Sequence, residues 1–201
     1  MSAPAVAIID SGGANIASLL YALERLDARA MLTTDANEIR SADRVILPGV
    51  GAARDAMQRL QKHELCDVIR SLEQPVLGIC LGMQLLADAS DEEDVECLGI
   101  IPGTARRLPA SVEHPVPNMG WCRIRQSSTH DIFRDPVDGT FFYFVHSYAL
   151  PVSEFTLAEA THAAAFSAMT GRDNFVAAQF HPERSSAAGS KLLKNFLEWS
   201  V

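Results

Sequence analysis

The sequence has no long hydrophobic stretch. Its longest apolar runs, such as residues 141–145 and 76–79, are far shorter than the roughly 20 residues that cross a bilayer. Near the first residue, no cationic region is followed by a long apolar segment, so no signal peptide is expected. We therefore expect a soluble, cytoplasmic protein with no membrane partner.

Positive charge is also scarce. Lysine and arginine number 17 against 25 acidic residues, which gives a formal net charge of −8 and a pI near 5.2. Without a basic stripe to neutralise phosphates, nucleic acid is not an expected partner. One acidic run lacks the Asp/Gly spacing of a calcium loop, and we expect it to be a solvated loop. The run comprises Asp88, Asp91, Glu92, Glu93, Asp94 and Glu96.

Cysteine is sparse, and none of it forms a C-x-x-C pair. The four cysteines are Cys66, Cys80, Cys97 and Cys122. Their scatter excludes zinc-ribbon and thioredoxin-like sites and favours reduced thiols in a cytosolic setting. We expect neither a metal nor a cofactor. One of the thiols could still be a nucleophile, and its local sequence must decide which.

The chain length of 201 residues suits one domain, residues 1–201, large enough to bury about 70% of its unfolded surface. The first half alternates predicted strands with predicted helices, which indicates a parallel sheet covered on both faces. The expected strands are 6–9, 28–32, 44–47 and 76–79; the expected helices are 16–26, 53 to about 72, and a short one through 86.

The second half is rich in strands. Segments 104–108, 121–125, 140–150 and 156–169 read as strands, 175–180 as a last buried strand, and the chain closes with a helix. The predicted fold class is therefore α/β, with a mostly parallel central sheet flanked by helices and an antiparallel extension.

Cys80 stands between two glycines where a predicted strand turns into a predicted helix. The segment Gly78-Ile79-Cys80-Leu81-Gly82 has the pattern of a nucleophile elbow, with sulfur in place of the serine oxygen. The flanking glycines let the strained turn pack without clashes, and the helix start favours a thiolate. The bare pattern is equally compatible with a buried cysteine in a tight turn.

A base and its orienting group are found after the last buried strand, in His181-Pro182-Glu183. Residues i and i+2 of an extended chain point the same way, so Glu183 can hold the imidazole nitrogen that faces away from the sulfur. Alone, this tripeptide could be a surface turn. Together with the elbow, it predicts a catalytic set of Cys80, His181 and Glu183.

An acyl intermediate also needs donors for its oxyanion. The backbone amide of Leu81, directly after the nucleophile, is one candidate. The segment Pro48-Gly49-Val50-Gly51 leaves another predicted parallel strand at its carboxyl end, where ligands gather in such sheets. Its two glycines allow an amide to turn either way, although a plain turn is the simpler alternative.

These motifs resemble those of the triad-type, or class I, glutamine amidotransferases, whose fold is flavodoxin-like. Four further segments are similar to one subfamily, the glutaminase subunits of imidazole glycerol phosphate synthase, and the resemblance runs from about Ile9 to Phe196. The segments are Pro48-Gly49-Val50-Gly51, Met119-Gly120-Trp121, Tyr143-Phe144-Val145-His146-Ser147-Tyr148 and Phe180-His181-Pro182-Glu183-Arg184-Ser185.

The resemblance implies that Cys80 attacks the side-chain amide of glutamine, with His181 as acid and then base. It implies an oxyanion held by the amides of Leu81 and Val50 or Gly51, in the Gly49–Gly51 segment. It also implies a heterodimer in which a barrel-shaped cyclase receives the ammonia for histidine biosynthesis. Gln84, Ser147 and Tyr148 would cradle glutamine, and Asn15, Trp121, Tyr143 and Arg184 would lie on the partner side.

Two features depart from the family pattern. Cys122 follows Met-Gly-Trp where asparagine is common, so an interface hydrogen bond is absent or replaced, and the turn at residues 10–15 has small side chains. Three rival functions remain. They are a glutaminase that serves another synthase, such as the pyridoxal-phosphate one; a cysteine hydrolase or protease; and a silent scaffold for a partner.

Overall fold

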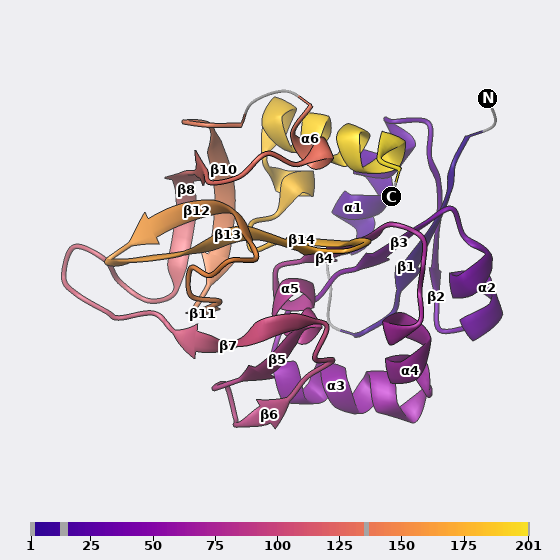
Figure 1. Ribbon diagram of the computed structural model, residues 1–201, viewed down its shortest axis with the longest axis horizontal. Coiled ribbons are helices and arrows are strands. Elements are labelled where there is room, and N and C mark those ends of the chain that lie inside the picture. The colour runs from indigo at the N-terminus through magenta and orange to yellow at the C-terminus, as the bar shows by residue number, and fades with distance from the viewer. Residues whose placement is uncertain (1–2, 13–15, 135–136, 201) are drawn as a thin grey trace.

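The computed structural model describes residues 3–12, 16–134 and 137–200 and is built on an eight-stranded sheet (Figure 1). Its strand order is β2-β1-β3-β4-β14-β13-β12-β9. The first five strands in that order are parallel, and the remaining pairings are antiparallel. The strands are β1 Ala5–Ile9, β2 Arg29–Thr33, β3 Arg44–Leu47, β4 Val76–Ile79, β9 Arg125–Gln126, β12 Thr156–His162, β13 Ala164–Arg172 and β14 Phe175–Ala178. The predicted fold class is confirmed.

Helices cover both faces of this sheet and enclose a hydrophobic core on each. Helices α1 and α6 lie above the sheet in Figure 1, whereas α3, α4 and α5 lie below it. The helices are α1 Ile16–Glu24, α2 Ala36–Ser41, α3 Ala53–Lys62, α4 Leu65–Arg70, α5 Leu81–Leu86 and α6 Ser186–Glu198. All side chains of β4 and β14 are buried between the layers, which explains their apolar sequences.

Two smaller sheets complete the fold. One has the order β11-β7-β5-β6, and the other pairs β8 with β10 in antiparallel register. Two short 3₁₀ turns also occur: η1 precedes β10, and η2 follows β14. The elements are β5 Ala87–Ser90, β6 Val95–Glu96, β7 Ile101–Arg107, β8 Asn118–Arg123, η1 Asp131–Phe133, β10 Phe141–His146, β11 Tyr148–Ala149 and η2 Pro182–Arg184.

Several element predictions were wrong in detail. The expected helix over 53–72 breaks in two, because Glu64 takes the left-handed φ of 57° between α3 and α4. The acidic run is not only a loop, since it includes parts of β5 and β6. By contrast, the segment 156–169 is rich in strand as predicted, because it belongs to the β12–β13 hairpin that turns at Ala163.

Helix α2 was missed, although the sequence contains its start signal. Asp35 accepts hydrogen bonds from the amides of Asn37 and Glu38, which is how an aspartate caps a helix. Glu38 follows three residues after the cap, as in a capping box.

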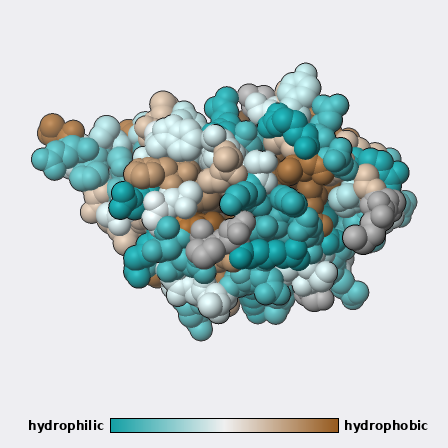
Figure 2. All heavy atoms as spheres, turned by 90° about the horizontal axis from the view of Figure 1, so that it is seen from above, coloured by the Kyte–Doolittle hydropathy of each residue, from teal (hydrophilic) through white to brown (hydrophobic). Residues whose placement is uncertain are grey.

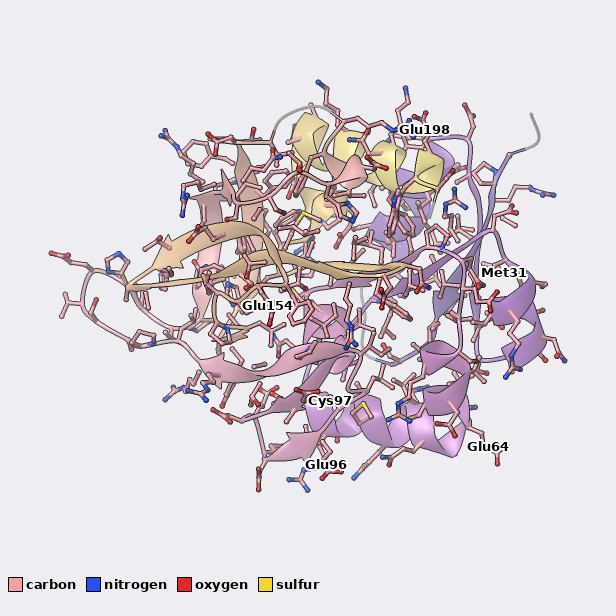
Figure 3. All side chains as sticks on the ribbon, viewed as in Figure 1. Met31, Glu64, Glu96, Cys97, Glu154 and Glu198 are labelled. Atoms are coloured by element: carbon pink, nitrogen blue, oxygen red, sulfur yellow. The ribbon has the colours of Figure 1, made fainter. Side chains whose placement is uncertain are left out.

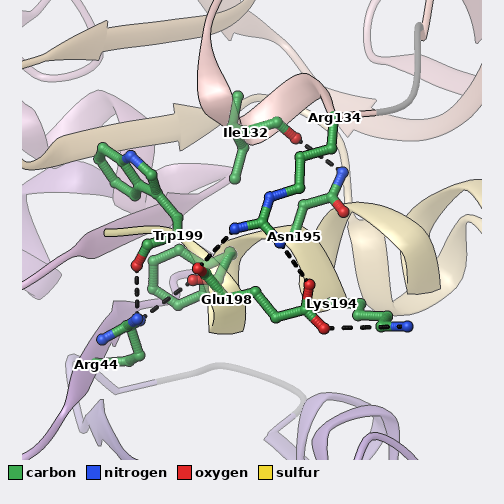
Figure 4. Close-up of polar contacts among 8 residues, drawn as sticks. Arg44, Ile132, Arg134, Lys194, Asn195, Glu198 and Trp199 are labelled. Carbon is green, nitrogen blue, oxygen red and sulfur yellow. Dashed lines mark hydrogen bonds and ion pairs between the residues drawn. The ribbon is translucent and has the colours of Figure 1, made fainter. Parts of the chain in front are cut away.

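The end of α6 is held by two arginines, of which Arg44 belongs to the sheet and Arg134 follows η1 (Figure 4). Arg44 at the start of β3 donates to the carbonyl oxygens of Phe196, at 3.2 Å, and Trp199, at 2.5 Å. Arg134 donates to the carboxylate and the carbonyl oxygen of Glu198. Cations at a helix C-terminus satisfy its last carbonyl groups, so these contacts fix the helix that follows the His-Pro-Glu segment.

The surface on the α6 side is mainly hydrophilic, with separate smaller hydrophobic patches (Figure 2). In the described ranges, we find no helix with both the length and the apolar character needed to span a membrane.

Candidate active site

Cys80 lies at the sharp turn between β4 and α5. Its backbone has φ 54° and ψ −109°, a conformation that is strained for any residue other than glycine. The turn packs directly on the end of β3: a Cβ atom on Gly82 would stand 1.8 Å from the carbonyl oxygen of Leu47. Only glycine fits there, which gives the physical reason for one of the two glycines of the elbow.

His181 follows β14, the strand next to β4, and this neighbouring position brings it to the elbow. Its amide donates to the carbonyl of Tyr143 at 2.9 Å, and its carbonyl accepts from the hydroxyl of Ser185 at 2.7 Å. Its Nδ1 atom lies 2.9 Å from Oε1 of Glu183, and the two side chains are only 11% and 9% exposed. The imidazole is therefore held by the Glu183 carboxylate, and Cys80 is its second side-chain partner.

Electrostatics favour the protonated imidazole. Burial by itself would lower the pKa of His181, but the hydrogen bonds and charges of Cys80 and Glu183 outweigh burial and raise that pKa to about 10. An imidazolium beside the sulfur is the state that can give a proton to a leaving amine.

The oxyanion side of the site has a different arrangement. The amide of Leu81 donates to the carbonyl oxygen of Gly49 at 3.4 Å, so a carbonyl points to the place where a second donor is needed. Gly51 has φ +94°, and a Cβ atom there would meet nothing within 4 Å. In this conformation the hole predicted from Leu81 and Val50 is not formed, and their role as donors stays a prediction.

A cavity of about 330 Å³ joins these groups, a size typical of a small-molecule site. Every residue predicted for the catalytic set, the oxyanion segment and the glutamine cradle lines it, together with Arg184. The predicted residues that line the cavity are Gly49, Val50, Gly51, Cys80, Leu81, Gln84, Ser147, Tyr148, His181, Glu183 and Arg184.

Sequence reasoning missed several residues of this region. Glu92, assigned to a solvated loop, lines the cavity and accepts from the amide of Ala53 at 3.3 Å. His146 also lines it. Gln179 is fully buried, and its Nε2 atom lies 3.8 Å from the sulfur of Cys80. Gln179 could have been noticed in the sequence, because it is the one polar residue of the otherwise apolar run 175–180.

Two of the four residues predicted for the partner side, Trp121 and Tyr143, lie on the two-stranded sheet of β8 and β10. The rings of Trp121 and Tyr143 meet edge to face at 5.9 Å, and Trp121 is 52% exposed rather than a core aromatic. Arg184 is exposed in η2, and Asn15 lies outside the described residues. Cys122 turns inward, where its thiol donates to the side-chain oxygen of Asn118 at 3.5 Å.

The other three cysteines lack the environment of Cys80. Burial raises the pKa of Cys97 to about 11, and it also raises the pKa values of Cys66 and Cys122. Figure 3 shows Cys97 on the β6 side of the molecule, opposite α6. Within the described part of the chain, no cluster of histidine, cysteine and acidic side chains could hold a metal ion.

A strained cysteine beside a carboxylate-bound histidine, at the carboxyl ends of parallel strands, is the arrangement of a cysteine nucleophile with its general base. Residues 7–199 match the family model described as glutamine amidotransferase class-I. The chain belongs to the class I glutamine amidotransferases.

More specific relatives are similar over nearly the whole chain. The chain is 47% identical to imidazole glycerol phosphate synthase subunit HisH of Pectobacterium atrosepticum, over 96% of this chain and 98% of that protein. It is 48% identical to subunit HisH 2 of Legionella pneumophila (strain Lens), over 96% of each.

Solved structures share the fold at low identity. A crystal structure titled glutamine amidotransferase has a TM-score of 0.74 at 18% identity, covering 96% of this chain and 97% of that one. The structure of PurLQS from Thermotoga maritima has a TM-score of 0.73 at 16% identity, covering 98% of each chain. These likenesses concern the fold alone.

Proposed function

We propose that this chain hydrolyses glutamine to glutamate and ammonia and supplies the ammonia to the synthase subunit of imidazole glycerol phosphate synthase in histidine biosynthesis. The observation that carries the chemistry is the buried contact between Cys80, at the strained elbow, and His181, whose other nitrogen is bound by Glu183. The near full-length similarity to the two HisH subunits supports the choice of pathway.

The reaction starts when the thiolate of Cys80 attacks the side-chain carbonyl carbon of glutamine. The tetrahedral intermediate collapses as the imidazolium of His181 protonates the amide nitrogen, which leaves as ammonia and gives a thioester. His181 then takes a proton from water, and the hydroxide adds to the thioester. Collapse of this second intermediate releases glutamate and restores the sulfur, while Glu183 keeps the imidazole oriented throughout.

The oxyanion segment is the element that the partner controls in this proposal. In the idle state the carbonyl of Gly49 accepts from Leu81, and one donor of the hole is missing. Turning the Gly49–Val50 peptide would replace that carbonyl with the amide of Val50. Partner binding with its substrate present drives this change, so the isolated chain hydrolyses glutamine slowly and wastes little ammonia.

The partner binds across the outer side of the two-stranded sheet of β8 and β10. Three large apolar side chains are exposed there: Met119 at 65%, Trp121 at 52% and Phe141 at 48%. Exposed apolar patches and aromatic residues are common at the centre of protein interfaces. Tyr143, Arg184 and Asn15 belong to the same proposed interface. The proposal includes a single domain and a cytoplasmic location.

The test uses the complex with its synthase subunit and compares two nitrogen sources. Cys80→Ala should abolish glutamine-dependent synthesis, by at least about 10⁴-fold, and leave synthesis from added ammonium salt largely intact. Cys122→Ala is the matched control, since it also removes a thiol but should preserve both activities. Both activities falling together in Cys80→Ala would exclude a separate ammonia-supplying subunit.

The same preparation separates the rival functions. Cleavage of peptides rather than glutamine would indicate a protease, and binding without any hydrolysis would indicate a scaffold. Stimulation only by a different synthase would assign the glutaminase to another pathway.

A further inference from the structure

Gln179 is a polar residue buried in the core. It follows β14 directly and is 0% exposed, among apolar neighbours. A buried carboxamide needs hydrogen-bond partners, because an unsatisfied donor costs about 1–3 kcal/mol. The partners of Gln179 are Gln84 and the nucleophile itself: Gln84 donates to its Oε1 atom at 3.3 Å, and its Nε2 atom lies 3.8 Å from Sγ of Cys80.

The orientation of this amide is fixed by a chain of obligatory donors and acceptors. The carbonyl oxygen of Tyr148 can only accept, so the NH₂ group of Gln84 must face it, at 3.0 Å. The second hydrogen of that NH₂ group then points to Gln179, which must present its oxygen. The NH₂ group of Gln179 is consequently turned to the sulfur of Cys80.

The carbonyl oxygen of Tyr148, where this series of hydrogen bonds begins, has a second partner. The imidazole Nδ1 of His146 lies 2.9 Å from the same carbonyl of Tyr148 and therefore carries the proton. Nε2 of His146 then accepts from the side-chain amide of Asn118 at 3.0 Å. Burial lowers the pKa of His146 to about 4, so it remains neutral and this arrangement persists through the physiological range.

The sulfur has two buried contacts of opposite character. The carbonyl oxygen of Val145, 3.6 Å away, can accept a hydrogen bond from the thiol but repels a thiolate. The amide of Gln179 does the reverse, because a thiolate is a much better acceptor than a thiol and bonds to charged groups are about twice as strong.

We propose that Gln179 is a positioning residue that donates an N–H to Sγ of Cys80, favours its thiolate and directs the sulfur for attack. The inference deepens the proposed function and rests on it. It gives Cys80 a second hydrogen-bonding side chain besides His181. Unlike His181, this amide does not exchange its proton during the reaction.

The experiment measures alkylation of Cys80 by iodoacetamide as a function of pH, with the modified residue identified by mass spectrometry. Gln179→Leu removes the donor and should slow alkylation near neutral pH by about tenfold or more, because the thiolate loses a charge-assisted hydrogen bond. The deficit should disappear at high pH, where the thiol ionises without help. The near-isosteric Gln179→Glu places a carboxylate beside the sulfur and should be at least as slow near neutral pH.

Thr170→Val is the matched control. Thr170 is buried on the neighbouring strand, and its hydroxyl has no hydrogen-bond partner among the described residues, so this change should leave the profile unchanged. Unchanged alkylation in both Gln179 variants, or a deficit of equal size at every pH, would overturn the proposal in favour of a packing role. If Gln179→Leu does not fold, Gln179→Glu carries the test.

Alkylation needs no glutamine, so the two proposals can fail separately. A wild-type complex that never hydrolyses glutamine, but whose thiol still responds to Gln179, would refute the proposed function and leave the positioning role standing.

Discussion

The two sides of the cavity differ in how completely they are built. On the nucleophile side, Cys80 is held in a strained turn, and His181 is already bound to Glu183. On the oxyanion side, the amide of Leu81 is occupied by the carbonyl of Gly49. We infer that the catalytic side chains are preassembled and that the orientation of the Gly49–Val50 peptide determines whether they can hydrolyse glutamine.

Packing explains the difference. The elbow lies between β3 and β14, and a Cβ atom on Gly82 would collide with the backbone of Leu47 at 1.8 Å. Gly51, by contrast, is exposed, with open space where a Cβ atom would be. Gly49 is itself buried against Leu81, so the freedom of this segment lies on its Val50–Gly51 side, whereas the elbow is packed from both neighbouring strands.

The first prediction on this comparison removes a donor from the oxyanion side. Val50→Pro removes the N–H of residue 50, so stimulated glutamine hydrolysis should fall by about 10² to 10³, or ~2.7–4 kcal/mol. Synthesis from ammonium and binding of the partner should survive. The measurement is stimulated turnover in the complex, with binding checked separately.

Val50→Ala is the control for that prediction, because it shortens the side chain and keeps the N–H. It should cost much less than the proline variant. Equal, small losses in the two would mean that Val50 supplies no essential donor and that Gly51 or another loop does.

The second prediction concerns stability and tests whether the nucleophile side is a charged, assembled cluster. The pKa of His181 is raised in the folded chain to about 10, against about 6.5 when unfolded. The resulting stabilisation is fully present below pH 6.5 and is lost as the pH rises through 10. Between pH 7 and pH 10, the wild type should therefore lose about 3–4 kcal/mol more free energy of unfolding than His181→Gln.

Denaturant unfolding at the two pH values provides this measurement. Parallel losses in both proteins would show that His181 carries no additional charge in the folded state, and the nucleophile side would then not be an assembled ion pair.

The sequence was most informative where local pattern and chemistry coincide. The elbow around Cys80 and the segment from His181 to Glu183 could be predicted because glycine spacing and strand ends determine their geometry. Gln179 could not, since its role depends on Gln84 and Tyr148, which only the folded chain brings close. The break at Glu64 was hidden for a similar reason: nothing in its local sequence competes with a continuous helix.

The orientation of the Gly49 carbonyl was also beyond the sequence, for a different physical reason. Two glycines around Val50 permit both peptide orientations, so the choice belongs to the conformational state and its partners rather than to residue identity. The sequence could locate the oxyanion segment, residues 49–51, but not the orientation of its peptide in the idle chain.

The most direct test of the preassembled nucleophile and the unformed oxyanion hole follows two rates on the same protein, with and without the synthase subunit and its substrate. One is alkylation of Cys80 by iodoacetamide, and the other is glutamine turnover. We expect partner and substrate to raise turnover by about 10² to 10³ while alkylation changes by less than about threefold, since the nucleophile is already in place. Alkylation that rises in parallel with turnover would contradict the account, because the partner would then be assembling the nucleophile and not the oxyanion hole.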